Sequence, residues 1–491
     1  IYRSPHPAMA EVKYVHQNIG FEAIDAASGK FNITNRFYFT NLKKYQIHYS
    51  VVANGKTVRS GKVSLDIAPQ ASKEFTVPVN GLKARPGTEY FVNFNVIAVE
   101  PEPLIPAGYE IAYDQFRLPV EAEKNTYKAN GPALQTHTQG DELTVSSSKV
   151  NFVFNKKSGL VTSYKVDGTE YFKDGFGIQP NFWRAPNDND YGNGAPKRLH
   201  VWKQSSKDFH VTDTKVSTED KAVLLQATYL LAAGNLYVVT YKIYPSGVVN
   251  VNARFTSTDM QATETEVSEA TRMATFTPGS DAARKAASKL EVPRIGVRFR
   301  LPARMNNVQY FGRGPEENYI DRNHGTIVGV YQTTADKMYF NYVRPQENGH
   351  HTDTRWLTLS PNKGSGLAIV ADSLVGFNAL RNSIEDFDSE EALPHPYQWN
   401  NFSPEEVANH DENAARNVLR RMHHVNDIIP RDFVEVCVDM KQQGVGGYDS
   451  WGARPEPFHQ IPANREYNWG FTLVPVRSGS QAAEAAQYDY R

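Results

Sequence analysis

Tyr45–Leu65 reads YQIHYSVVANGKTVRSGKVSL and predicts a β-hairpin. From Tyr45 to Val51, apolar or aromatic residues alternate with polar ones, which is the period of a strand with one buried face. Asn54-Gly55 follows, the strongest short-range signal for a tight hairpin turn. Val58–Leu65 then returns as the second strand. This hairpin makes a β fold the first expectation for the chain.

The same alternation recurs along the rest of the chain. Up to about Pro119 it comes in short strands roughly 8–12 residues apart, so residues 1–120 are predicted to form an all-β sandwich. A polar stretch, Glu121–Gly131, reads as a linker or a first edge strand. Residues 121–476 are then predicted to form one large antiparallel β domain, because no clean break interrupts them. Its expected strands are Val150–Phe154, Gly159–Val166, Val223–Tyr229, Leu236–Tyr244, Val248–Phe255, Arg294–Leu301, Arg355–Ser360, Leu367–Ala371, Phe433–Met440 and Tyr467–Val474.

Helix is expected to be scarce. Ser403, followed by Pro404 and Glu406, has the residues of a capped helix start. Asn413–His423 is a second helical candidate, and residues 279–289 read as a loop or short helical insertion. Residues 477–491 form a polar, alanine-containing tail that we expect to be poorly ordered.

Composition excludes some classes of function. With 53 Lys and Arg against 54 Asp and Glu, the net charge of -1 gives no electrostatic reason to expect nucleic acid or an anionic membrane as partner. No apolar run approaches the roughly 20 residues of a spanning helix. The one cysteine, Cys437, excludes an internal disulfide and is expected to be an inert strand thiol. The compartment stays open, with cytoplasm favoured over periplasm. The first residues, Ile1–Pro7, resemble no signal peptide and lack Met, so a processed product, a fragment or a separate subunit is expected.

Four segments concentrate residues that could carry chemistry. The first (180–192, PNFWRAPNDNDYG) contains Asp-x-Asp, but a calcium loop starting at Asp188 would need Glu where Leu199 stands, so a polar turn is favoured. The second (311–322, FGRGPEENYIDR) could hold a glycosidase carboxylate pair, although a buried Arg–carboxylate network is favoured. The third (342–351, YVRPQENGHH) has adjacent histidines, which make a poor chelating pair, and loop packing is favoured.

The fourth segment, the glycine loop (444–451, GVGGYDSW), places the Trp451 indole beside a tight backbone turn. An aromatic face on a loop is well suited to stack on the apolar face of a sugar ring. The alternative is a core tryptophan. Four others are better candidates for the core: Trp183, Trp202, Trp356 and Trp469.

In order and spacing, the four segments resemble the C-terminal portion of the large β-galactosidases of glycoside hydrolase family 2. Pro5-His6-Pro7-Ala8 and Asp66–Gln70 look like the immunoglobulin-like domain that precedes it in that family. The resemblance covers nearly the whole chain. It implies that residues 1–120 are the second immunoglobulin-like sandwich and residues 121–476 a super-sandwich related to galactose mutarotase.

The resemblance also implies what is absent. The family's two catalytic glutamates and its active-site magnesium ligands lie on a (β/α)₈ barrel, and this chain has no alternating strand–helix pattern. We therefore expect no catalytic residue, no metal site and no bound cofactor in this chain, with Mg²⁺ and Na⁺ belonging to the intact enzyme. The expected partners are a galactoside, the barrel domain and further copies of the chain.

Site residues carry over from the resemblance one by one. Trp451 matches the indole that stacks on the non-galactose part of the substrate, with Asp449 and Ser450 beside it in the predicted substrate-binding loop. Gly192 matches the glycine that starts a mobile loop, and Gly194 adds a second flexible position. Two alternatives stay open: a free-standing carbohydrate-binding protein, and an aldose epimerase. For the epimerase, no catalytic histidine or glutamate can be matched.

Overall fold

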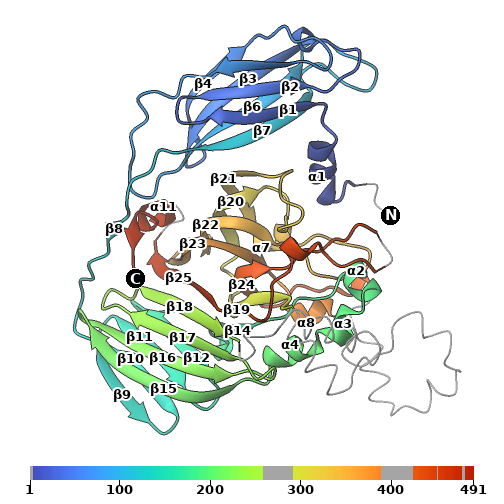
Figure 1. Cartoon of the computed structure of the whole chain (residues 1–491). Helices are drawn as coiled ribbons and strands as arrows, with labels where there is room; N and C mark the ends of the chain where they lie inside the picture. The colour runs from blue at the N-terminus through green and yellow to red at the C-terminus, as the bar shows by residue number, and fades with distance from the viewer. Residues whose placement is uncertain (1–3, 258–290, 389–423, 450–451, 478–480) are drawn as a thin grey trace, which may run out of the picture.

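Strands dominate the computed structural model, which describes residues 4–257, 291–388, 424–449, 452–477 and 481–491 (Figure 1). The helices predicted at 403–406 and 413–423 and the insertion at 279–289 lie outside the described residues. Two β-sandwiches follow one another along the chain, the smaller one first. The expected all-β fold class is confirmed.

The first sandwich consists of a three-stranded and a four-stranded antiparallel sheet, drawn in blue at the top of Figure 1. The order β1–β2–β5 forms one sheet and β4–β3–β6–β7 the other. Phe94 lies at the centre of the core between them, stacked on Phe21 at 4.8 Å and edge-on to Phe31 at 5.0 Å. The elements are β1 (Ile19–Asp25), β2 (Lys30–Asn35), η1 (Leu42–Lys44), β3 (Tyr45–Ala53), β4 (Lys56–Val63), β5 (Ser72–Thr76), β6 (Tyr90–Ala98) and β7 (Glu110–Leu118).

The predicted hairpin is confirmed as β3 and β4. Asn54 and Gly55 connect the strands with φ of 46° and 77°. Positive φ at both central residues is the geometry that Asn-Gly adopts at low cost, and its twist matches the twist of the flanking strands. The local sequence therefore sets this register.

A helix that the sequence analysis did not predict precedes the first strand. α1 (Ala8–Val15) has no buried residue. Its Glu11 side chain accepts a hydrogen bond from the Gly325 backbone N–H at 2.7 Å, far along the chain. The two-turn helix was missed because eight residues are too few to display a helical period, and contact with the second sandwich holds it.

The second sandwich packs a five-stranded sheet, β13–β12–β11–β10–β9, against a twelve-stranded one. The path of the large sheet is β14–β19–β24–β23–β25–β18–β17–β16–β15, and β20, β21 and β22 branch from it through β23. The elements of the five-stranded sheet are β9 (Gln135–Gln139), β10 (Glu142–Ser146), β11 (Val150–Asn155), β12 (Leu160–Val166) and β13 (Thr169–Glu170). Those of the large sheet are β14 (Gln179–Asn181), β15 (His210–Glu219), β16 (Ala222–Leu230), β17 (Leu236–Ile243), β18 (Val249–Thr256), β19 (Arg294–Pro302), β20 (Asn307–Gly314), β21 (Ile327–Thr334), β22 (His351–Ser360), β23 (Gly366–Leu380), β24 (Phe433–Gln442) and β25 (Tyr467–Val476).

Short helices connect these strands. The longest run of them, α2 to α4, lies between β14 and β15 and carries the end of the first segment. The helices are η2 (Lys173–Gly175), α2 (Asp188–Gly192), α3 (Ala195–Arg198), α4 (His200–Ser205), α7 (Ala335–Met338), α8 (Ile384–Phe387), η4 (Val425–Asp427) and η5 (Pro457–His459).

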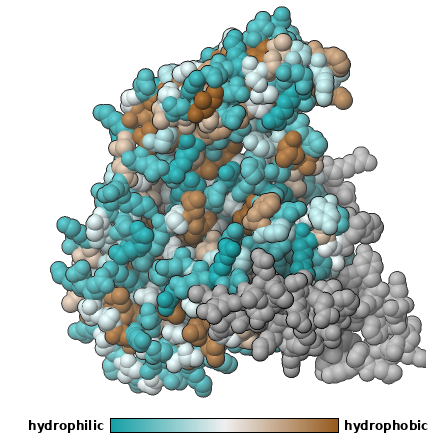
Figure 2. Space-filling model, in the orientation of Figure 1, coloured by the Kyte–Doolittle hydropathy of each residue, from teal (hydrophilic) through white to brown (hydrophobic). Residues whose placement is uncertain are grey.

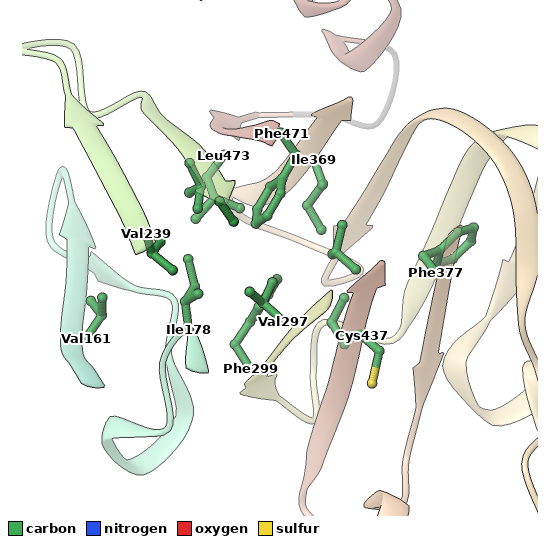
Figure 3. Packing of buried hydrophobic residues seen from close by; sticks show 14 of the residues in the cluster. Val161, Ile178, Val239, Val297, Phe299, Ile369, Phe377, Cys437, Phe471 and Leu473 are labelled. Carbon is green, nitrogen blue, oxygen red and sulfur yellow. The ribbon is translucent and has the colours of Figure 1, made fainter. Parts of the chain in front are cut away.

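The core of the second sandwich is aliphatic and aromatic (Figure 3). Phe471 and Leu473 of β25, Phe299 of β19 and Phe377 of β23 point into it, each fully buried. Cys437 of β24 belongs to the same core, and burial raises the pKa of its thiol well above the ordinary value. The expected inert strand thiol is thus found. The four tryptophans predicted to be core residues are 7% exposed or less.

The tail expected to be poorly ordered is packed instead. Its described part forms α11 (Gln481–Ala485) and β26 (Tyr488–Asp489), and β26 pairs in parallel with β8 (Asn125–Thr126) in the predicted linker. Tyr490 is 3% exposed. Composition misled the prediction, because small alanines pack closely on the sheet despite their low hydrophobicity. Figure 1 shows α11 and β8 side by side on one flank of the molecule.

The face seen in Figure 2 is mostly hydrophilic, with scattered hydrophobic residues and no broad apolar region among its coloured atoms. None of the helices that the structure describes is long and apolar enough to cross a lipid bilayer.

Candidate functional site

The four segments singled out from the sequence meet at one cleft of about 300 Å³ in the second sandwich. Each of them contributes at least two of its lining residues, although they are separated by up to about 250 residues in the chain. We call it the four-segment cleft. It is lined by Asn187, Asp188, Asn189, Glu317, Tyr319, Asp321, Arg322, Tyr342, Gln346, Glu347, Val445 and Gly446.

Arg184 ties the first segment to the glycine loop. Its guanidinium forms two hydrogen bonds to the Asp190 carboxylate, at 2.8 and 3.2 Å. It also donates to the carbonyl oxygens of Gln443 at 2.7 Å and Gly444 at 3.0 Å. Arg184 is 2% exposed. A buried, bidentate Arg–carboxylate pair with additional carbonyl acceptors fixes both backbones in place.

The Asp-x-Asp stretch caps a helix, as the favoured polar-turn interpretation requires. The Asn187 side chain accepts from the Asp190 N–H at 2.8 Å, while the Asp190 carboxylate accepts from the Asn187 N–H at 3.1 Å. This reciprocal pair is a capping box at the start of α2. Asn187 Nδ2 also donates to the Val445 carbonyl at 2.9 Å. Within the described residues, no group of three or more His, Cys, Asp or Glu side chains could hold a metal ion.

The glycine loop packs tightly against the second segment. The Gly446 N–H donates to Asp321 Oδ2 at 2.8 Å. Asp449 accepts from the N–H groups of Gly452 at 3.1 Å and Ala453 at 3.0 Å, two residues that follow Trp451 in the sequence. Ser450 and Trp451 themselves are outside the described residues, and their substrate contacts remain predictions.

The two predicted hinge glycines lie beside this loop. Gly192 ends α2, and a Cβ atom added at Gly452 would lie 2.8 Å from the Gly192 carbonyl oxygen. Gly194 has φ of 72° between α2 and α3, a conformation that side chains disfavour. The structure thus brings the predicted hinge and the predicted sugar-stacking loop into contact. Motion of the hinge remains a prediction.

The second segment forms the Arg–carboxylate network that the sequence analysis favoured over a catalytic pair. Glu317 Oε1 accepts from Arg322 at 2.8 Å and from the Tyr342 hydroxyl, and Oε2 accepts from the Gly349 N–H at 2.6 Å. Glu316 is exposed while Glu317 is buried, so the two neighbouring carboxylates do not face one site.

The histidines of the third segment are packing residues. His350 stacks on Tyr319 with ring centroids 5.3 Å apart, and His351 lies 4.7 Å from the Tyr310 ring. Burial lowers the pKa of His350 well below the ordinary value and that of His351 to about 4. Both imidazoles are therefore neutral near pH 7 and closed off from solvent, which gives the epimerase alternative no support.

A buried ion cluster beneath the cleft escaped the sequence analysis. Arg294 of β19 lies 3.0 Å from the Asp439 carboxylate of β24 and 3.5 Å from Glu347, and all three are buried. Burial raises the pKa of Asp439 to about 7 and that of Glu347 above its ordinary value, against the opposing charge of Arg294. The available signal was the presence of charged residues within two strands that are otherwise largely apolar, since a charge in such a strand needs a partner when it is buried.

Comparison with known proteins identifies the family to which the chain belongs. The family model described as "Beta galactosidase small chain" matches residues 146–473, and that of "Beta-galactosidase, domain 4" matches residues 31–119. The chain is 32% identical over 473 residues to a β-galactosidase of Priestia megaterium, covering 96% of this chain and 40% of the relative. It is 26% identical over 480 residues to one of Streptococcus thermophilus, with the same coverage.

The chain thus spans about 40% of the length of these relatives, and it corresponds to a C-terminal part of them. Among solved structures, a galactose 1-epimerase of Lactobacillus acidophilus aligns with a TM-score of 0.31 and 9% identity, covering 71% of this chain and 99% of that one. The family match extends over most of the chain and includes the whole four-segment cleft, and the chain belongs to the β-galactosidase small-chain family.

Proposed function

We propose that this chain is the C-terminal part of an enzyme that hydrolyses terminal non-reducing β-D-galactosides with retention of configuration. The observation that carries the proposal is the family match over residues 146–473, which includes all four segments of the cleft. The chain supplies one wall of the substrate site and surfaces for assembly.

The catalytic carboxylates are assigned to a barrel domain outside this chain. Retaining hydrolysis uses two carboxyl groups roughly 5 Å apart, one as acid and base and the other as nucleophile. The buried carboxylates of the cleft are already engaged, Glu317 by Arg322 and Glu347 by Arg294. Carboxylates committed to separate arginines do not form the free pair that this reaction needs, so this chain alone is expected to be inactive.

Trp451 is the residue proposed to touch the substrate, on the aglycone side of the galactosyl group. Asp449, two positions before Trp451 in the sequence, accepts hydrogen bonds from the Gly452 and Ala453 N–H groups that follow it. An indole offers a large apolar face at little cost in conformational entropy, which suits the apolar face of a sugar ring. Ser450 is the polar neighbour that could reach a sugar hydroxyl.

The further assignments are part of the same proposal. Mg²⁺ and Na⁺ are placed with the barrel-bearing part of the intact enzyme. The expected partners are the galactoside, the barrel domain and other copies of the chain in a homo-oligomer, and cytoplasm is favoured over periplasm as the compartment.

Replacing Trp451 by Ala in the full-length protein tests the proposed contact. KM for lactose should rise about tenfold, with a smaller change for nitrophenyl galactoside, since the indole contacts the part of the substrate beyond galactose. Trp451→Phe is the matched control and should restore most of the affinity. Unchanged lactose kinetics in Trp451→Ala would contradict the role.

An assay of the isolated 491-residue chain tests whether the catalytic carboxylates lie outside it. A pure sample should not hydrolyse nitrophenyl galactoside, whereas the full-length protein should. Turnover by the isolated chain would show that it holds a carboxylate pair of its own, and would overturn the proposed division.

A further inference from the structure

The four-segment cleft contains buried polar atoms that no described residue satisfies. The Tyr319 hydroxyl, Asp321 Oδ1 and Arg322 Nε are all buried and lack a hydrogen-bond partner. Tyr319 is 2% exposed as a whole. An unsatisfied buried polar group costs about 1–3 kcal/mol, so three of them around one cavity favour a guest that completes their hydrogen bonds.

The charges around the cleft disfavour an anionic guest. Glu317 is paired with Arg322 at 2.8 Å, Glu347 with Arg294 at 3.5 Å, and Asp188 at the rim with Arg344 at 3.5 Å. Asp321 Oδ2 accepts from the Gly446 N–H and lies within the field of the buried Arg184. Because Arg294 also pairs with Asp439 and Arg184 also pairs with Asp190, the carboxylates here outnumber the arginines, and the cleft offers an anion no free cation.

The unsatisfied atoms differ in kind, and this difference narrows the class of guest. Asp321 Oδ1 can only accept as a carboxylate, Arg322 Nε can only donate, and the Tyr319 hydroxyl can do both. A ligand that both donates and accepts at closely spaced positions meets all three, and vicinal hydroxyl groups have this property.

We propose that the four-segment cleft is itself a binding site for one pyranose, held through its hydroxyl groups by Tyr319, Asp321 and Arg322. The volume of about 300 Å³ lies at the small end of ligand pockets and suits a single sugar ring. The choice of a sugar over another polyol rests on the proposed function, while the site itself rests on the cleft and its unsatisfied atoms.

Tyr319→Phe is the informative variant. It deletes the hydroxyl and keeps the ring, which stacks on His350 and lies 5.1 Å from the Arg322 guanidinium. Because that hydroxyl has no partner among the described residues, its loss should leave thermal stability unchanged or higher. Tyr241→Phe is the matched control, since that hydroxyl is equally buried but lies in the core away from the cleft.

The binding experiment uses saturation-transfer NMR and calorimetry on the isolated chain with galactose, and with glycerol and L-arginine as comparison probes. Galactose should bind with a millimolar Kd, and Tyr319→Phe should weaken it about five- to tenfold while Tyr241→Phe does not. No binding of galactose up to about 100 mM, or equal binding by Tyr319→Phe, would overturn the proposal. So would equal affinity for glycerol, or preference for L-arginine, which would identify the cleft as a socket for a basic side chain.

This inference and the proposed function can fail separately. If the full-length protein hydrolyses lactose but the isolated chain binds no galactose, the inference falls and the function stands. If the chain binds galactose but the full-length protein hydrolyses no galactoside, the proposed function falls and the sugar site stands.

Discussion

Gly444 lies where the glycine loop passes the Asp321 carboxylate at the edge of the cleft. A Cβ atom added there would lie 2.6 Å from Asp321 Oδ2 and 3.0 Å from the Pro455 side chain. The same addition at Gly446 would meet Asp321 Oδ2 at 3.4 Å and nothing else within 4 Å. Close packing therefore requires glycine at position 444 but leaves room for a side chain at position 446.

Gly444→Ala should destabilise the chain by about 1–3 kcal/mol, because the added methyl group must displace the carboxylate or the loop. Gly446→Ala, the matched control, should cost less. Thermal unfolding of both variants checks the difference, and equal melting temperatures would show that the loop yields freely at Gly444.

At the scale of elements, strand β26 of the tail packs against the predicted linker at the flank of the second sandwich. Tyr490 packs on Tyr127 with centroids 4.6 Å apart, and its carbonyl accepts from the Tyr244 hydroxyl at 2.7 Å. The pairing of β26 with β8 fixes both at the flank of the sheet. The linker and the tail are ordered by each other rather than by their own sequences.

Tyr490→Ala should lower the free energy of unfolding by about 3 kcal/mol, the usual cost of removing a buried aromatic side chain. Tyr488→Ala removes the same side chain from a position that is 37% exposed and should cost clearly less. Urea unfolding measures both. A tail that contributed nothing to stability would leave both variants like the unmodified chain.

Over the whole molecule, the two sandwiches meet through specific polar contacts, and residues of both also line a cavity of about 560 Å³. Gln115 of β7 and Val328 of β21 exchange hydrogen bonds at 2.9 and 2.8 Å. Arg355 pairs with Glu89 at 2.7 Å. Asp114 lines the cavity, and burial raises the pKa of its carboxyl from 3.8 to about 6, although the Gln115 N–H opposes the shift.

The raised pKa of Asp114 predicts that the stability of the chain depends on pH through the region where the two sandwiches meet. The folded state holds the Asp114 proton more tightly than the unfolded state does, so this contribution to stability is complete below about pH 4 and is lost as the pH rises through about 6. Asp114→Asn removes the ionisation. Its melting temperature relative to the unmodified chain should therefore rise between pH 4 and pH 7, by the equivalent of roughly 1–3 kcal/mol.

Asp141→Asn is the control for this effect, because Asp141 is exposed in the turn between β9 and β10. Its melting temperature should follow that of the unmodified chain at every pH. If the melting temperature of Asp114→Asn relative to the unmodified chain does not change with pH, Asp114 is not a buried carboxyl that ionises in this range.

Local signals account for the features that the sequence predicted well. Alternation over five or more residues gave strands such as β6 and β17, because one face of each is more deeply buried than the other. The Asn54-Gly55 turn followed from its own φ preferences. Short helices such as α1 and α2 were missed, because a distant contact holds α1 and a capping box holds α2, and neither has a long apolar stripe.

The sequence by itself determined the all-β class, the hairpin, the buried thiol of Cys437 and the identity of the four segments, because each depends on neighbours along the chain. Only the tertiary structure decided that these segments share one cleft, that Arg294 and Asp439 lie beneath it, and that the tail pairs with the linker. Those contacts join residues that are far apart in the chain. No local pattern encodes such a contact, because its energy exists only once the sheets have brought the partners together.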